Sequence, residues 1–271
     1  MATRRKNLLS ISLALVLMVT MCSMAFADSM IDRVIRDGVL KVGWASWHPY
    51  AFLDADTGEP TGLSIELVTN LASELGVELE LVEDSWGTFI AGLQGGKFDI
   101  WMNCSITLAR ALQIGYTDGI TIHPGSFVVT KSWRAEHPEV ESIWDMDSSD
   151  YSVFVTLGSN TAGNLKANFS DINIIELEKS PEMITGIFAD RADAAVYDYA
   201  GGYFVVQDRP DELEILPGFL PANEVGFAIP RDDYFSLYWL NLWITKVVRE
   251  RVVQDLMDKY GMPPGMLLGG E

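Results

Sequence analysis

The chain is poor in cysteine, and this scarcity excludes a fold held by disulfides. Of its 271 residues only Cys22 and Cys104 are cysteines. Cys22 falls in an N-terminal segment that we expect to be cleaved, so the mature chain would carry one thiol and no internal disulfide. No Cys–His spacing points to a nucleophile, and we interpret Cys104 as a small packed side chain. The hydrophobic core must therefore hold the fold together.

Positive charge and histidine are also scarce. The chain has 19 lysines and arginines against 38 aspartates and glutamates, a formal net charge of −19, and three histidines. Such an acidic surface repels phosphate backbones, so nucleic-acid binding is disfavoured and we expect no nucleic acid as a partner. The histidines lack the paired spacing of metal ligands, so we expect no metal, and no motif indicates another cofactor. We expect a soluble monomer.

Long hydrophobic runs are absent except near the N-terminus. There, three basic residues (4–6) precede an apolar run (8–21) and the small-residue site Ala25-Phe26-Ala27. This pattern is typical of a secretory signal peptide, and we expect cleavage after Ala27 and export to the periplasm. A lipid anchor on Cys22 is disfavoured because Met21 stands where a lipoprotein signal requires a small residue. No later run approaches the roughly 18 apolar residues of a membrane span.

The hydrophobic periodicity after the signal peptide alternates between strands and helices, which predicts an α/β fold. The expected strands of a first set are 39–44, 78–83 and 98–102, with helices at 63–75 and 89–93. The expected strands of a second set are 151–156, 172–177 and 192–197, with helices at 161–169 and 181–188. Strand–helix–strand units of this kind form parallel sheets covered by helices. We therefore predict two lobes, each with a parallel-rich sheet.

Two extended apolar segments, 127–131 and 223–229, lie at the ends of the second set. They are the expected crossings between the lobes and would form a two-strand hinge. The predicted domains are a signal peptide (1–27), the first part of lobe one (28–128), lobe two with the crossings (129–224), and the rest of lobe one (225–271). An aromatic cluster between 234 and 243 belongs to the returning helices, where core or interface packing explains it.

The segment 85–118 carries the clearest functional signal. Arg110 follows the expected strand 98–102, and the carboxyl ends of strands are where open α/β sheets bind ligands. Its planar guanidinium suits a carboxylate, although a surface salt bridge is the alternative. A small organic acid is the implied ligand.

The second lobe offers two complementary features. Ser159, Asn160 and Thr161 open an expected helix just after a strand, where unpaired N–H groups attract anions. An ordinary N-cap by Ser159 or Asn160 is the alternative. Asp198 ends the strand 192–197 and could accept a cation there, or could cap the segment that follows.

These motifs resemble those of the amino-acid-type periplasmic solute-binding proteins of ABC importers, a family with the type II periplasmic binding fold. The resemblance spans about residues 38–261 and rests on GVLKVG (38–43), on W-x-x-F-I-x-x-L-x-x-G-K-x-D (86–99), on SIT-x-x-R (105–110) and on RADAAVYD (191–198). The chain departs from the family pattern in three places. The segment 99–107 is one residue shorter, Glu66 replaces the usual aspartate, and Leu108-Ala109 replaces the usual Pro-Glu. The shorter segment bears on how Asn103 and Ser105 face the ligand.

The resemblance implies a role for each candidate residue. Arg110 would hold a ligand carboxylate, helped by backbone N–H groups at 159–161, and Asp198 would take the α-ammonium group. Trp47 and Trp86 could sandwich the ligand's side chain, which favours apolar, aromatic or cationic groups, and core packing is the alternative for each. The core explains Trp44 and Trp101 better. Because Ala45-Ser46 replaces the acid of lysine- and arginine-selective relatives, strongly basic ligands are somewhat disfavoured, although Glu83 and Asp84 could supply a negative charge from the neighbouring loop.

The function implied is capture of an amino acid or related small zwitterion between the lobes and delivery to an ABC permease. An enzyme similar to the cyclohexadienyl or arogenate dehydratases, which share this scaffold, is one alternative. A free-standing sensor that presents its ligand to a receptor is another.

Overall fold

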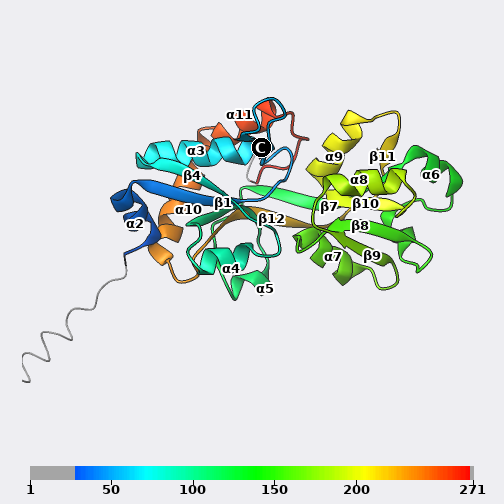
Figure 1. Ribbon diagram of the computed structural model, residues 1–271, viewed down its shortest axis with the longest axis horizontal. Helices are drawn as coiled ribbons and strands as arrows, with labels where there is room; N and C mark the ends of the chain where they lie inside the picture. The colour runs from blue at the N-terminus through cyan, green and yellow to red at the C-terminus, as the bar shows by residue number, and fades with distance from the viewer. Residues whose placement is uncertain (1–27, 269–271) are drawn as a thin grey trace, which may run out of the picture.

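The computed structural model describes residues 28–268 as two α/β lobes side by side along the long axis of the molecule (Figure 1). The predicted two-lobed fold is confirmed. The predicted signal peptide and Cys22 lie outside the described residues. Within residues 28–268, none of the helices combines the length and the apolar character needed to cross a membrane.

Lobe one is built from segments at both ends of the chain. Its strands are β1 (Val39–Trp44), β2 (Phe52–Leu53), β3 (Pro60–Thr61), β4 (Glu78–Glu83), β5 (Ile100–Ser105) and β6 (Gly115–Tyr116). Its helices are α2 (Met30–Asp37), α3 (Leu63–Leu75), α4 (Phe89–Gln94), α5 (Leu108–Ala111), α10 (Tyr234–Arg249) and α11 (Val252–Lys259).

Lobe two is continuous in sequence. Its strands are β8 (Ser152–Thr156), β9 (Asn173–Leu177), β10 (Ala194–Asp198) and β11 (Leu213–Ile215). Its helices are α6 (Lys131–Glu136), the 3-10 helix η1 (Ile143–Met146), α7 (Asn160–Asn168), α8 (Pro181–Phe188) and α9 (Tyr199–Asp208). The long strands β7 (Thr121–Thr130) and β12 (Leu220–Ile229) run between the lobes.

One sheet runs through both lobes in the order β4-β1-β5-β12-β7-β10-β8-β9. The outer strands pair in parallel, β1 with β4 and β5, and β8 with β9 and β10. The central strands β7 and β12 are antiparallel to each other and to their neighbours β10 and β5. The carboxyl ends of β5 and β10 consequently face each other across the junction of the lobes, where ligands of such sheets bind.

The crossing point is set by strand pairing. His123 pairs with Asn223, and Gly125 pairs with both Leu220 and Asp198. Beyond Gly125 strand β7 follows β10, so the segment 127–131, which we expected to be the crossing, runs within lobe two. Strand β12 joins lobe one from Val225, which pairs with Ser105.

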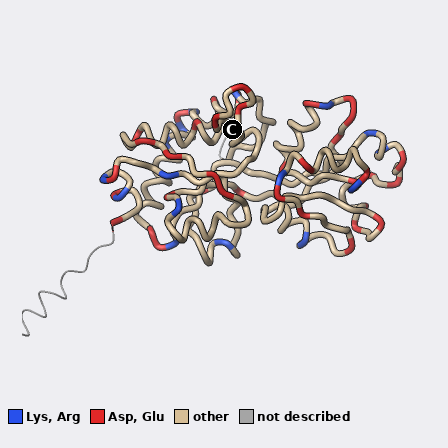
Figure 2. Tube along the Cα trace, viewed as in Figure 1, with Lys and Arg blue, Asp and Glu red and all other residues tan. Residues whose placement is uncertain are grey.

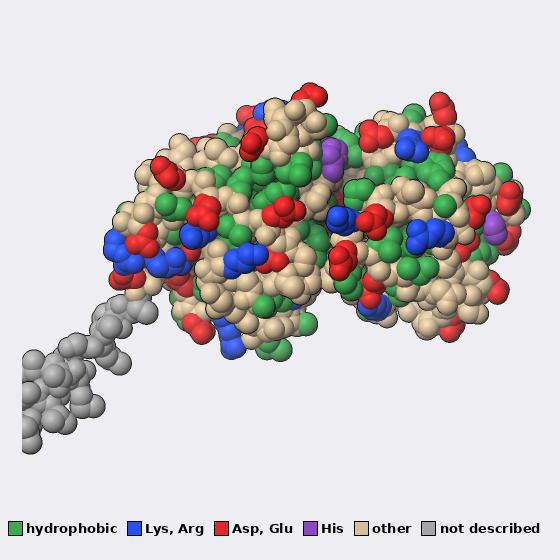
Figure 3. Space-filling model, in the orientation of Figure 1, with side chains coloured by type: hydrophobic (Ala, Val, Ile, Leu, Met, Phe, Trp, Pro, Cys, Tyr) green, Lys and Arg blue, Asp and Glu red, His purple; other side chains and the backbone are tan. Residues whose placement is uncertain are grey.

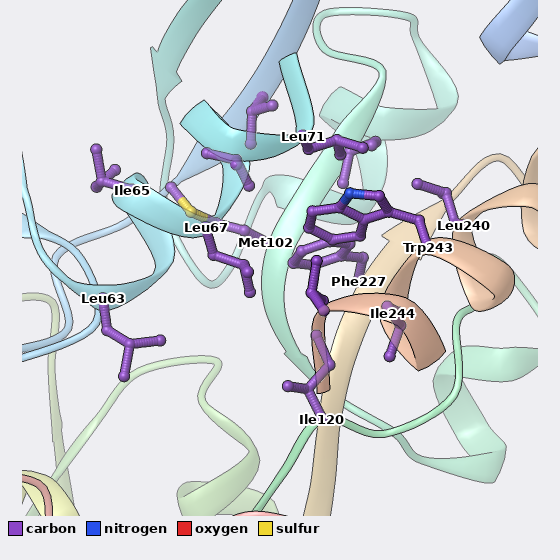
Figure 4. Packing of buried hydrophobic residues seen from close by; sticks show 14 of the residues in the cluster. Leu63, Ile65, Leu67, Leu71, Met102, Ile120, Phe227, Leu240, Trp243 and Ile244 are labelled. Carbon is purple, nitrogen blue, oxygen red and sulfur yellow. The ribbon is translucent and has the colours of Figure 1, made fainter. Parts of the chain in front are cut away.

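Each lobe has its own hydrophobic core. In lobe one, α3 and α10 cover the sheet, and Leu71, Met102, Phe227 and Trp243 pack between them (Figure 4). In lobe two a separate cluster surrounds Phe127 and Val153. Separate cores allow each lobe to remain rigid while the connection between them bends.

The aromatic cluster of α10 divides between two environments. Trp243 is buried in the core of lobe one, as expected, whereas the side chains of Tyr234, Phe235 and Tyr238 are exposed. Acidic residues are distributed over both lobes and outnumber basic ones (Figure 2).

Candidate functional site

A small cavity of about 70 Å³ lies between the lobes, where β5, β7 and β10 meet. It receives side chains from both lobes and from the crossing strand β7. Eight of the nine residues expected to bind ligand line it: Trp47, Trp86, Ser105, Arg110, Ser159, Asn160, Thr161 and Asp198. The structure thus brings together residues that are up to 151 positions apart in sequence.

Arg110 reaches into the cavity from α5, a single turn that follows β5. Thr107 caps this turn by accepting a hydrogen bond from the Arg110 backbone N–H at 3.2 Å. The guanidinium carbon lies 5.2 Å from the centroid of the Phe89 ring, and Nη2 donates to the Gly158 carbonyl of lobe two at 3.0 Å. Arg110 therefore links the lobes directly and keeps further N–H donors for a ligand.

The thiol of Cys104 lies beneath this arginine, 4.0 Å from Nη1 and 3.7 Å from the Tyr116 hydroxyl. Burial raises the pKa of the Cys104 thiol to about 11. A neutral, buried thiol is a poor nucleophile, which agrees with a packing role.

The start of α7 forms the opposite wall. Ser159 caps the helix, its Oγ accepting a hydrogen bond from the Ala162 N–H at 3.1 Å. The capping alternative therefore holds for Ser159, and yet Ser159, Asn160 and Thr161 also line the cavity. The first turn of the helix presents N–H groups without intrahelical partners, so a carboxylate would find donors here.

Asp198 also has two roles, since it caps a helix and lines the cavity. Its Oδ2 accepts a hydrogen bond from the Gly201 N–H at 3.1 Å and so caps α9. Its Oδ1 accepts a hydrogen bond from Trp47 Nε1 of lobe one. Asp198 and Arg110 are thus opposite charges from opposite lobes in one cavity, and each already contacts the other lobe.

His123 is a cavity residue that the sequence analysis did not select. Its Nε2 lies 2.8 Å from Thr121 Oγ1 and 3.3 Å from the Tyr50 hydroxyl, while its Nδ1 lies 3.5 Å from Asp198 Oδ2 and makes no hydrogen bond. The imidazole is buried and oriented between Asp198 and the core. In the sequence it is one of three histidines without paired spacing, and it lies outside the segment expected to cross between the lobes, so no pattern marked it as a site residue.

Trp47 and Trp86 touch instead of facing each other across a gap. Their ring centroids are 5.7 Å apart at an interplanar angle of 80°. A side chain stacked between two rings needs about 7–8 Å, twice a carbon contact of about 3.5–4.0 Å. The predicted sandwich is therefore closed in this conformation, whereas Trp44 and Trp101 are buried in the core as expected.

Asn103 is the candidate residue that the structure places outside the cavity. It is buried, has a positive φ of 57°, and its Oδ1 accepts a hydrogen bond from Ser64 Oγ at 2.6 Å. Asn103 thus ties β5 to the start of α3. The segment 99–107, one residue shorter than the family pattern, contains this unusual backbone turn, while Ser105 at the strand's end still reaches the cavity.

The lobes also approach each other through two glycines. A Cβ on Gly158 would lie 3.0 Å from both the Cα and the N of Gly87, which belongs to lobe one. Any larger residue at Gly158 would therefore push against backbone of the other lobe in this closed conformation.

We expect Gly158→Ala to weaken ligand binding by tenfold or more, because closure would meet this contact. The matched control is Gly76→Ala, which has nearly the same φ (69° against 71°) but open space around its Cβ. Both changes carry left-handed backbone strain of about 1–2 kcal/mol. Equal affinities of the two variants in titration calorimetry would contradict the role of Gly158 in closure.

Among residues 28–268, no group of three or more histidine, cysteine, aspartate or glutamate side chains is placed to hold a metal ion.

Comparison with known proteins supports the sequence resemblance. The sequence profile of the bacterial extracellular solute-binding proteins, family 3, matches residues 40–263. The L-cystine-binding protein TcyJ of Escherichia coli is 24% identical over 250 residues, which cover 92% of each chain. The cyclohexadienyl dehydratase of Pseudomonas aeruginosa is 23% identical over 237 residues, 85% of this chain and 87% of the relative.

Solved structures agree. The ancestral amino acid-binding protein AncCDT-1, a precursor of cyclohexadienyl dehydratase, superposes with a TM-score of 0.79 at 28% identity, covering 86% of this chain and 99% of that chain. The cysteine-binding protein from Campylobacter jejuni also reaches a TM-score of 0.79, at 18% identity and covering 90% of this chain and all of that one. At 18% identity, the likeness to the cysteine-binding protein shows only a shared fold.

Proposed function

Since the chain belongs to the bacterial extracellular solute-binding proteins of family 3, we propose that it captures an α-amino acid or a related small zwitterion between its lobes and delivers it to an ABC permease. The observation that carries this proposal is that Arg110 and Asp198, from opposite lobes, line the same interlobe cavity. A zwitterion offers each of them the opposite charge. Relatives named for amino acids or cystine support the ligand class.

The geometry suggests how binding would drive closure. The ligand carboxylate would lie between Arg110 and the N–H groups at the start of α7, and the ammonium group would lie against Asp198. These groups belong to different lobes, so the ligand contacts both only when the lobes are closed. Preferential binding to the closed form shifts the population toward it, and the permease would recognise that form.

The expected signal peptide supports export, and the family's role supports a permease of the inner membrane as partner. We propose that the mature protein acts in the periplasm as a monomer. Size-exclusion chromatography with light scattering tests the oligomeric state, and fractionation with N-terminal sequencing tests export and cleavage after Ala27.

A thermal-shift screen of the purified protein against the common amino acids and their relatives tests the ligand class. A ligand that binds only the folded state stabilises it by mass action and so raises the unfolding temperature. At a ligand concentration of a hundred times Kd, the free energy of unfolding increases by about 2.7 kcal/mol. At least one α-amino acid should give such a shift, and calorimetry should confirm it. If none of them shifts the unfolding temperature, the proposed ligand class is wrong.

A dehydratase is the second candidate, because a named relative is a cyclohexadienyl dehydratase and because Asp198 lies 3.5 Å from His123 in the cavity. An acid catalyst needs a proton on its carboxyl group. Asp198 instead accepts hydrogen bonds from Trp47 Nε1 and the Gly201 N–H, an arrangement that suits an ionised carboxylate. We therefore propose binding without catalysis. Turnover of prephenate or arogenate by the purified protein would reverse this choice.

A further inference from the structure

The cavity that holds Arg110 and Asp198, at about 70 Å³, is the smaller of two spaces that adjoin at the junction of the lobes. The head group of an amino acid, with its carboxylate, its ammonium group and the carbon between them, would lie there between the two charges. The contact of Trp47 with Trp86 closes the gap between the indoles. A larger ligand side chain must therefore extend out of this cavity in another direction.

A second chamber of about 300 Å³ adjoins the first on the far side of Trp47. The two share four wall residues: Ser46, Trp47, Ser180 and Tyr197. A ligand whose head group lies between Arg110 and Asp198 would have to extend past these residues to reach the chamber.

The walls of the chamber are mostly apolar. Helix α8 contributes Pro181 and Ile184, and α9 contributes Phe204 and Val205. Figure 3 shows hydrophobic side chains gathered on this face of lobe two, beside the junction of the lobes. Apolar surface left in a cleft of a soluble protein marks a site that a ligand or partner covers.

Lobe one closes the chamber with a histidine. The His48 ring lies 5.2 Å from the Phe204 ring of lobe two, edge to face. Burial lowers the pKa of His48, and Asp208 opposes only part of that shift, so the ring is neutral at neutral pH. Asp208 and Arg209 are exposed where the chamber meets solvent. A group in the chamber touches both lobes and stabilises the closed form.

The alternative route is a polar groove of about 410 Å³ on the Trp86 side. It contains Glu83, Asp84 and Glu178, so a cationic side chain would prefer it. Asp84, however, already accepts hydrogen bonds from Lys97 Nζ at 3.0 Å and from Thr88 Oγ1. The four wall residues that the groove shares with the first cavity carry no acid: Ser46, Trp86, Thr156 and Ser180.

We propose that the ligand is an α-amino acid with a large apolar or aromatic side chain, and that this side chain occupies the chamber between α8, α9 and His48. This inference rests on the proposed function and names the class of amino acid that the site selects. Burying such a side chain in place of hydrogen strengthens binding by about 10- to 150-fold.

Titration calorimetry with glycine, phenylalanine, leucine and lysine tests the proposal. We expect phenylalanine or leucine to bind at least tenfold more tightly than glycine and lysine. Val205→Trp, which places an indole in the chamber and narrows it, should reduce this advantage and leave glycine binding unchanged. Phe204→Ala, a second variant, should weaken phenylalanine binding through lost contact. Unchanged glycine affinity shows that each variant is folded with an intact first cavity.

The matched control is Glu178→Gln, which alters the acidic groove and should leave phenylalanine affinity unchanged. Tightest binding of lysine, with a loss in Glu178→Gln, would place the side chain in the groove and overturn the chamber while the proposed function stands. Equal affinities for glycine and phenylalanine would overturn the chamber as well. Failure of all four amino acids, together with a negative thermal-shift screen, would reject the proposed function itself.

Discussion

Replacing Arg110 with alanine is expected to weaken ligand binding by about 2–5 kcal/mol, the range for truncating one partner of a buried, hydrogen-bonded charge pair. The substitution leaves the ligand carboxylate in a narrow cavity with only the N–H groups of α7 as donors. It also removes the hydrogen bond from Nη2 to the Gly158 carbonyl, which joins the lobes. Affinity and closure should therefore fall together, as calorimetry and small-angle scattering can measure.

Two further variants separate the effects of charge and geometry. Arg110→Lys keeps the positive charge but loses the planar pair of donors, so its affinity should lie between those of the wild type and Arg110→Ala. Arg249→Ala removes the same charge from an exposed position at the end of α10 and should leave affinity unchanged. A wild-type affinity in Arg110→Ala would show that the guanidinium acts only as a structural link.

Local patterns predicted the elements whose ends are set by local chemistry. The expected bounds of β1, α3, β4 and α8 are those of the structure. For α3 the reason is visible, since Gly76 adopts the left-handed conformation that ends a helix. The alternation of acids with Val and Leu in β4 matches a strand at the edge of the sheet, where one face is exposed.

Features that depend on pairing between distant strands were harder to predict. Strand β5 extends to Ser105 because its last residues pair with β12, more than 100 positions later. The crossing lies at His123–Gly125 for the same reason, since only the pairing with β10 and β12 shows where β7 changes lobes. The apolar character of 127–131 reflects burial within lobe two.

The candidate site shows the same division. The resemblance identified eight cavity residues, and six of them lie at a strand end or in the first turn of a helix, positions that a sequence pattern marks well. Trp47 and Trp86 lie in loops and rest on the resemblance alone. Asn103 was expected in the cavity but lies outside it, and His123 was not selected, because the surroundings of both depend on tertiary contacts. A positive φ turns Asn103 toward Ser64, and the crossing strand carries His123 next to Asp198.

Asp198→Asn is the second substitution with a large expected effect, and it can separate the two roles of this residue. Asparagine is as good an N-cap as aspartate, so the cap of α9 should survive. The negative charge facing the ligand's ammonium group is lost, and a hydrogen bond to a charged group contributes about 1.5–3 kcal/mol. We expect affinity to fall by about 10- to 150-fold while the unfolding temperature changes little.

Asp233→Asn provides the matched control for this experiment. Asp233 caps α10 in the same way, accepting from the Ser236 N–H at 3.0 Å with one oxygen and from the Met30 N–H with the other, but it lies outside the cavity. An amide has one acceptor oxygen where the carboxylate has two, so any loss of stability from this difference should appear in both variants. Only Asp198→Asn should lose affinity, and an equal change in both would show that Asp198 serves the helix and not the ligand.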